Sequence, residues 1–188
     1  MIDRIVAAFS FKNGVYEEVE MDESFTKSAW IIVAISALLS SMGTSASTAG
    51  GFGSWLFGSI FSAAVAVGAF ALSCYLISWL SKALFNADTN FNELVRTLGL
   101  AYVWNAVGFL AIVSAISPAL KSVAWLFRTG SSIAGLVAWV IAAKEALDLE
   151  WGETALTIVI GWVAQRVIVW LFSLILLALG LGVGSALF

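Results

Sequence analysis

Three polar residues stand inside long apolar segments and are the first candidates for a functional site. Arg166 is the only charged residue between positions 154 and 188, and Tyr102 and Asn105 lie in a second uncharged run. A guanidinium offers five donors, an amide offers a carbonyl acceptor, and a phenol can donate or accept. These groups could line a path for an anion or a polar solute, or they could hydrogen-bond between helices as structural glue.

The depth of these residues in the membrane decides between the two interpretations. Arg166 and Asn105 each lie about 17 to 18 Å along a predicted helix, so they could meet if those two helices are neighbours. The sequence leaves two positions open for Arg166. It lies in mid-membrane, facing protein or water, or it lies at the interface and residues 167–188 form the span.

Catalysis has no visible basis in this sequence. There is no His, and the single Cys, Cys74, stands in an apolar run where we interpret it as a packing residue. Asp148, Glu150 and Glu153 fall together in a connector without the His or Cys ligands that would complete a metal site. Phosphate-binding glycine loops and nucleophile elbows are also absent from the sequence. We therefore expect a non-enzymatic protein with no cofactor and no metal.

Composition defines the elements that must position these residues. The 188-residue chain is 61% hydrophobic and 11% charged, against about 45–50% and about 25% for an ordinary soluble domain. Residues 28–81 contain no charged side chain, whereas one membrane crossing needs about 20 apolar residues. Net charge is −3 without a Lys/Arg block, which argues against nucleic acid as a partner. We predict an all-α polytopic helical bundle in the lipid bilayer, forming one membrane domain over residues 1–188.

Runs of apolar residues between charges predict five spans and two short interfacial helices. The spans are expected at about 28–46, 54–80, 97–117, 130–147 and 154–180. Residues 118–128 are assigned to an interfacial helix, because the uncharged run between Arg128 and Lys144 is short for a full crossing. Asn90 followed by Glu93 resembles a capping box, so the third helix should begin near Phe91.

The N-terminal segment, residues 1–27, is expected to be cytoplasmic or interfacial. Its apolar residues recur at helical spacing as Ile2, Ile5, Val6 and Phe9. This stripe is typical of a short helix that lies on a membrane surface. Six Lys or Arg residues fall on the N-terminal side of the membrane and two on the other side, which favours a cytoplasmic N-terminus and an external C-terminus.

Small residues at four-residue spacing predict where helices approach each other. The pairs and triplets are Gly58 with Ser62, Ala64 with Gly68, Ala134 with Ala138 and Ala142, and Gly180 with Gly184. Such stripes permit close packing of helix backbones within a bilayer. We favour contacts within this bundle over a dedicated interface with a second molecule.

Three stretches resemble the Yip family, the multi-pass membrane proteins that interact with Rab GTPases and have bacterial and archaeal relatives. They are Val15-Tyr16-Glu17-Glu18-Val19 with Asp22 and Ser28-Ala29-Trp30; residues 90–102, Asn-Phe-Asn-Glu-Leu-Val-Arg-Thr-Leu-Gly-Leu-Ala-Tyr; and residues 139–147 with Gly152-Glu153-Thr154-Ala155-Leu156. The resemblance covers about residues 11–171 and implies a five-span architecture. The chain lacks the long cytoplasmic N-terminal region through which eukaryotic members meet GTPases, so the resemblance implies the architecture and gives no evidence for GTPase binding by this chain.

The resemblance implies a non-enzymatic protein that organises membranes or binds other membrane proteins, or a second copy of itself, in a prokaryotic cytoplasmic membrane. Two alternatives remain open at this stage. The chain could be a small permease or channel component with Arg166 and Asn105 on a polar path. It could also be an accessory subunit that buries its small-residue faces against a larger membrane complex.

Overall fold

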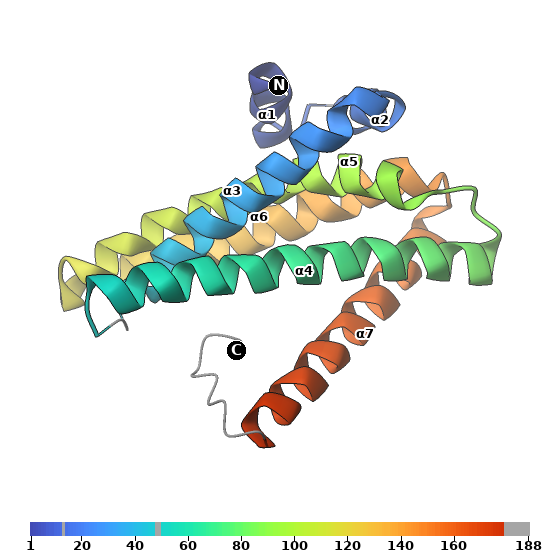
Figure 1. Ribbon diagram of the computed structural model, residues 1–188. Coiled ribbons are helices and arrows are strands. Elements are labelled where there is room, and N and C mark those ends of the chain that lie inside the picture. Colours follow the sequence, from blue (N-terminus) through green and yellow to red (C-terminus); the bar gives the residue numbers. More distant parts are fainter. Residues whose placement is uncertain (13, 48–49, 179–188) are drawn as a thin grey trace.

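The computed structural model describes residues 1–12, 14–47 and 50–178, with the side chains of 118, 164–166 and 168–178 outside the description. The chain is 88% helical, without strands in the described ranges. Long helices run side by side as a bundle, and a short N-terminal segment lies across one side of it (Figure 1). This confirms the predicted all-α helical bundle.

Among the described residues, four helices are long and apolar enough to cross a membrane. They are α3 (Thr26–Ser45), α4 (Phe52–Phe85), a third helix made of α5 (Phe91–Ala101) and the 3-10 helix η2 (Tyr102–Ala115), and α6 (Lys121–Leu147). The predicted capping box is present at the start of α5, where the Asn90 side chain accepts from Glu93 N and the Glu93 carboxylate accepts from Asn90 N. Asn86 and Asp148 follow α4 and α6 in the left-handed conformation, which these two residue types tolerate.

The prediction of a separate interfacial helix at 118–128 was wrong. A short 3-10 turn, η3 (Pro118–Leu120), leads directly into α6, which continues without a break to Leu147. Lys121 and Arg128 are both exposed in the first turns of α6, so their long side chains can reach toward the membrane surface while the backbone remains helical. A charge near a helix end therefore does not mark a helix boundary.

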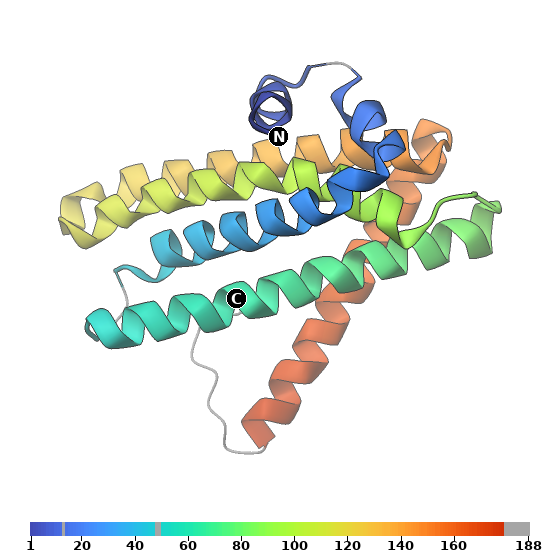
Figure 2. The ribbon, with the colours of Figure 1, turned by 45° about the horizontal axis from the view of Figure 1, so that its top comes forward.

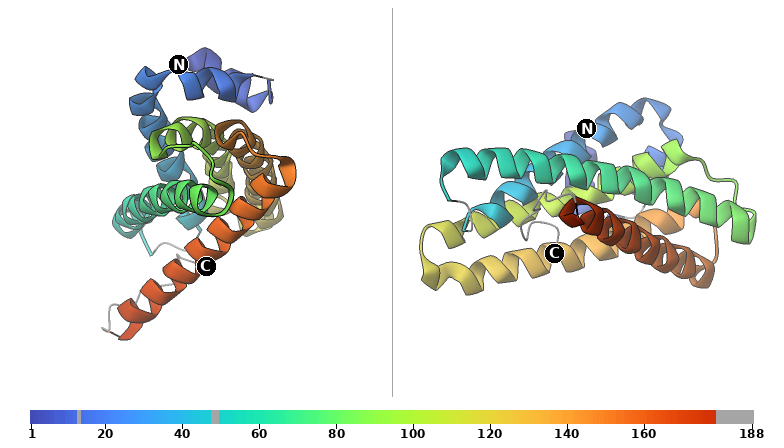
Figure 3. Two further views of the ribbon diagram at one scale, coloured as in Figure 1. Left: turned by 90° about the vertical axis from the view of Figure 1, so that its right-hand side faces the viewer. Right: turned by 60° about the horizontal axis from the view of Figure 1, so that its bottom comes forward.

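The last helix, α7 (Trp151–Ala178), covers most of the predicted span at 154–180. It starts beside the ends of α4 and α6, contacts both, and then diverges from the other helices (Figures 2 and 3). Gly161 of α7 lies against Ile77 of α4 at this crossing. Residues 179–180 and most side chains of the second half of α7 lie outside the described residues, so a fifth crossing stays a prediction.

The N-terminal segment consists of α1 (Ile2–Phe9), α2 (Val15–Met21) and the 3-10 turn η1 (Glu23–Phe25). Gly14 precedes α2 with a φ of +79°, a left-handed conformation that glycine adopts without steric cost. Ala8, Val19 and Phe25 of this segment are buried. It packs on α5, η2 and α6.

Glycines allow α3 and the third helix to approach each other closely. A Cβ added to Gly43 would overlap the carbonyl oxygen of Gly108 and lie 2.8 Å from the Cα of Phe109. A Cβ on Gly108 would meet the Ser40 hydroxyl at 2.9 Å, and one on Gly99 would meet the Ala29 Cβ at 3.0 Å. These contacts join two backbones without intervening large side chains, as expected for packing within a bilayer.

The predicted alanine stripe of α6 is part of the bundle interior. Ala138 and Ala142 have no exposed surface, and Ala134 is half-buried. One turn before this stripe, the Ser131 hydroxyl donates to the carbonyl of Trp104 at 2.7 Å and joins α6 to η2. Ala138 and Ala142 of this stripe therefore face the bundle interior.

The predicted small-residue contacts of α4 are not formed inside the bundle. Gly58, Ala64 and Gly68 are exposed, and Ser62 is half-buried. No described atom lies within 4 Å of a Cβ built on Gly58 or Gly68. The reason is rotational: α4 turns its other face, with Ser59, Ala63 and Phe70, toward the bundle. Gly180 and Gly184 lie outside the described residues.

Candidate functional site: the polar junction

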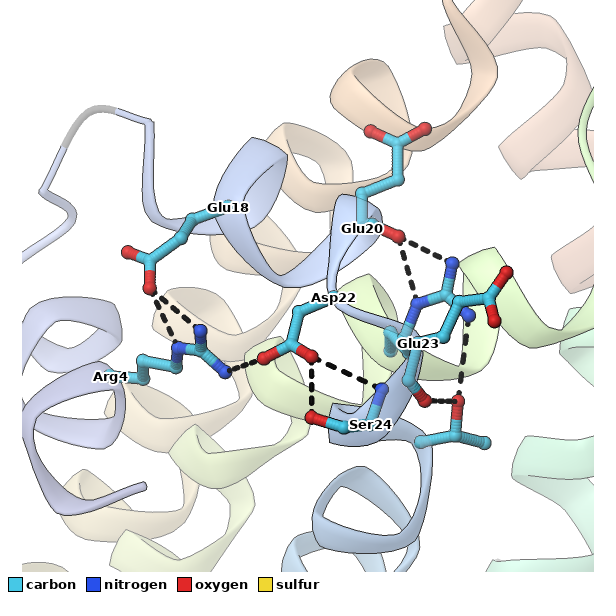
Figure 4. Close-up of polar contacts among 8 residues, drawn as sticks. Arg4, Glu18, Glu20, Asp22, Glu23 and Ser24 are labelled. Atoms are coloured by element: carbon cyan, nitrogen blue, oxygen red, sulfur yellow. Dashed lines mark hydrogen bonds and ion pairs between the residues drawn. The ribbon is translucent and has the colours of Figure 1, made fainter.

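The polar groups of the chain gather where the N-terminal segment meets α5 and the end of α6. All twelve acidic residues lie in the N-terminal segment or at this end of the long helices. We call the contact of α2 and η1 with the buried Arg96 of α5, together with Arg4 of α1, the polar junction. Figure 4 shows its hydrogen bonds and ion pairs.

Arg96 is the buried cation of this junction. The capping box fixes the start of α5, and from Leu94 onward each residue of α5 is buried. Arg96 is 5% exposed, and its Nε donates to the main-chain carbonyl of Glu20 at 2.9 Å. Its Nη2 donates to the same carbonyl, and Nη1 is 3.5 Å from the Thr26 hydroxyl. Burying a charge is costly unless it is hydrogen-bonded, so these bonds offset the cost of burying the Arg96 guanidinium.

Arg4 forms a second, more exposed set of contacts. Its Nε donates to Glu18 Oε1 at 2.9 Å, and its Nη1 donates to Asp22 Oδ2 at 2.7 Å. The guanidinium also lies 5.0 Å from the centre of the Phe25 ring. Hydrogen bonds from Ser24 and then Arg4 lower the pKa of Asp22, and the bond to Asp22 raises the pKa of Arg4. Exposed pairs of this kind contribute little stability but define orientation.

Glu20 has the most perturbed carboxylate at this junction. Burial is the first cause, and the total effect raises the pKa of Glu20 to about 7. The neighbouring charges act in both directions: Asp148, Glu93 and Glu145 raise the pKa, and Arg96 lowers it. The side chain therefore changes its charge near neutral pH.

A small cavity of about 140 Å³ adjoins the junction between the N-terminal segment and α6. It is lined by Phe11, Lys12, Gly14, Tyr16, Ile141 and Glu145. Tyr16 is 2% exposed, and its hydroxyl has no hydrogen-bond partner among the described residues. Burial raises its pKa to about 12. The cavity is polar enough to hold water against this hydroxyl.

This arrangement holds elements together rather than assembling reactive groups. The described residues include no group of three or more His, Cys, Asp or Glu that could hold a metal ion. Cys74 is buried in α4, away from the polar junction. What the junction can do is fix the N-terminal segment on the side of the bundle, through the contact of Arg96 with the Glu20 carbonyl.

The sequence-predicted site is only partly brought together. The Asn105 amide donates to the Tyr102 carbonyl at 3.2 Å, a bond within one turn of η2. The Tyr102 ring packs edge-on against Phe70 of α4, with 5.4 Å between ring centres. Tyr102 and Asn105 therefore form a local contact of the helix rather than an extended polar network.

The proposed contact between Asn105 and Arg166 stays a prediction. Arg166 falls within α7, but its side chain lies outside the described residues. The contact needs the third helix and α7 to be neighbours. In the described part of α7, the packed neighbours are α4 and α6, and its ribbon runs away from the bundle (Figure 3).

Sequence reasoning missed Arg96 and the contact between Gly43 and Gly108. Arg96 entered only as a positive charge for orientation, although its position in an apolar run, six residues after the helix cap, is a signal of a buried partner. Gly43 falls inside the predicted span at 28–46 but was not among the predicted contact residues. Its spacing from Ser36 and Ser40 continues a helical stripe of small residues, which was a readable signal.

Comparisons of the chain with family models, with curated proteins and with solved structures gave no match. The resemblance to the Yip family therefore consists of the three stretches alone and has no support from these comparisons.

Proposed function

We propose that this chain is a non-enzymatic integral membrane protein that binds another membrane protein through the outward face of α4. The observation that carries the proposal is a stripe of exposed residues, which we call the α4 outer face: Phe57, Phe61, Ala64 and Gly68. Phe57 is 75% exposed and Phe61 57% exposed. Ala64 and Gly68 are exposed, and no described atom lies within 4 Å of a Cβ on Gly68.

The composition of the α4 outer face suits a partner helix. Its members recur at i, i+4, i+7 and i+11, so they form one seam along the helix. Two small residues beside two aromatic rings give a shallow notch next to protruding side chains. In a bilayer, where the hydrophobic effect does not drive helices together, such a shape favours association by close packing. α4 lies at one edge of the bundle (Figure 2).

The packed interior supports binding over the permease alternative. Gly43 and Gly108 bring α3 and η2 into close contact, and Gly99 of α5 packs against Ala29 of α3 nearer the polar junction. Asn105, the expected lining residue of a polar path, gives its amide to its own helix. A solute path needs polar groups that face an open lumen.

The proposal agrees with the class of function that the Yip resemblance implies, membrane organisation or binding of membrane proteins. We place the chain in a prokaryotic cytoplasmic membrane, with the polar junction on the cytoplasmic side. The charge asymmetry supports this orientation, since six of the Lys and Arg residues belong to the side of the polar junction.

Purification from native membranes in a mild detergent tests the proposal. We expect a partner, either another membrane protein or a second copy, to co-purify with the wild type at a fixed ratio. Gly68→Leu should remove it by filling the notch. The matched control is Gly130→Leu, because Gly130 is also an exposed helical glycine without described atoms within 4 Å of its Cβ position. Retention of the partner by Gly68→Leu, or purification of the wild type alone, would contradict the proposal.

A further inference from the structure

Helix α1 leaves an apolar flank uncovered although it is packed on the bundle. Ile2 is 71% exposed, Val6 is 60% exposed and Phe9 is 36% exposed. These residues recur at i, i+4 and i+7 and form one stripe. The opposite side of the helix is held in place. Ala8 is fully buried, and Arg4 donates hydrogen bonds to Glu18 of α2 and to Asp22, which follows α2. We call Ile2 and Val6 the α1 flank; Phe9, at the end of the same stripe, packs on Trp104.

The position of Arg4 gives the direction in which the α1 flank points. At about 100° per residue, Ile2 and Val6 each lie about 160° around the helix from Arg4. Arg4 reaches toward Glu18 and Asp22 (Figure 4), and α2 packs on α5 and α6 at the polar junction. The flank therefore points away from the polar junction, toward the membrane-spanning part of the long helices.

The location of α1 agrees with this direction. The ring of Phe9 contacts Trp104 of η2, with 5.0 Å between ring centres and an edge-on geometry. Trp104 lies beyond Arg96 along the third helix, so α1 is nearer the membrane interior than the junction itself. Figures 1 and 2 show α1 running across the long helices rather than along them. A helix in this orientation lies in the plane of the membrane.

We infer that α1 is an interfacial anchor whose flank inserts into the boundary between lipid headgroups and acyl chains. The occupant is lipid because α1 packs on η2, which belongs to one of the helices that are long and apolar enough to cross a membrane. Asp3 and Ser10, exposed on the adjoining flank, remain with the headgroups and water. The side chain of Arg4 joins this anchor to the polar junction. The inference is independent of the α4 outer face.

This division between two flanks is the arrangement of an in-plane amphipathic helix, with apolar side chains a few ångströms into the acyl boundary and polar ones outside it. It adds a direction to the surface helix expected from the sequence. The helix contacts lipid with the side that is opposite to Arg4, while a helix that merely covered the bundle would leave Ile2 and Val6 in water.

Fluorescence quenching by lipid tests the inference on the full chain in phosphatidylcholine vesicles. Cys74→Ala removes the single cysteine, and Val6→Cys then carries an environment-sensitive label. Asp3→Cys is the matched control on the same helix, because Asp3 is exposed on the polar flank. We expect lipids brominated on the acyl chain to quench the label at position 6 at least about twofold more than at position 3, with blue-shifted emission at position 6.

Ile2→Cys is a second variant at an exposed site and should behave like Val6→Cys. Equal quenching at positions 3 and 6, or a water-like spectrum at positions 2 and 6, would overturn the inference. Blue-shifted emission at position 6 without quenching by brominated lipid would also overturn it, since protein rather than lipid would then cover the flank.

Discussion

The buried guanidinium of Arg96 donates to the main-chain carbonyl of Glu20, 76 residues earlier in the chain. This bond joins α2 to α5 and fixes the N-terminal segment on the bundle. The acceptor is a backbone atom, so the contact depends on the path of the chain at Glu20 rather than on its side chain. The carboxylate of Glu20 is left free to respond to its acidic neighbours.

Replacing Arg96 with Gln should release the N-terminal segment. The variant loses the donors to Glu20 and leaves a carbonyl unpaired, a loss of about 1.5–3 kcal/mol. Hydrogen exchange followed by mass spectrometry should show faster exchange of the Val15–Met21 amides. Lys82→Gln is the control, because Lys82 is an exposed cation at the same end of the bundle. Unchanged protection of α2 in Arg96→Gln would contradict the assigned contact.

The stability of the folded chain should depend on pH through Glu20. Its pKa is raised from 4.5 to about 7, so the folded chain retains a proton that the unfolded chain releases. Stability should therefore fall as pH rises from about 4.5 to about 7, and this contribution should be constant above that range. Asp22 has a lowered pKa, so its contribution changes only at more acidic pH.

Thermal unfolding in detergent micelles between pH 5 and pH 8 measures this dependence. Glu20→Gln should flatten the decline, whereas Glu17→Gln, at an exposed position of the same helix, should keep the wild-type profile. Superimposable profiles for Glu20→Gln and the wild type would show that Glu20 does not titrate in this window.

Gly43→Ala should destabilise the bundle. The added Cβ meets the backbone at Gly108 and Phe109, which cannot yield as a flexible side chain would. Overpacking of this kind costs about 1–3 kcal/mol. Gly58→Ala, in open space on α4, should be neutral or slightly stabilising, since alanine favours a helix by about 1 kcal/mol over glycine. Equal unfolding temperatures for the two variants would argue against the contact between α3 and η2.

Sequence analysis anticipated features that depend on local patterns. The capping box at Asn90 and Glu93 and the uncharged run of residues 28–81 each act over a few turns of chain, so they can be read directly. The continuity of α6 was missed because the cost of Arg128 depends on whether its side chain can reach the membrane surface. That property is set by the tilt and rotation of α6 in the bundle.

Contacts between distant segments were not readable in the same way. Arg96 and Glu20 meet because α2 folds back over α5, and no local pattern encodes this fold. The α4 glycines were assigned to the interior because four-residue spacing identifies a face of a helix but not its partner. For Gly58 and Gly68, the face that was identified is turned outward.

The orientation of the chain in the membrane can be measured with single cysteines. In a Cys74→Ala background, Ser47→Cys should react with an impermeant thiol reagent added outside the cell. Asp88→Cys should react only after the membrane is opened, because the loop between α4 and α5 lies on the side of the polar junction. Both positions are exposed. The reverse labelling pattern would invert the proposed topology.

The most direct test of the central claim is photocross-linking from the α4 outer face in native membranes. A photoreactive amino acid at Phe61 should give one cross-linked protein adduct of defined mass. The same amino acid at Leu136, which is 55% exposed on α6, should give lipid adducts only. Lipid adducts alone at both positions would contradict the claim that this face binds another membrane protein.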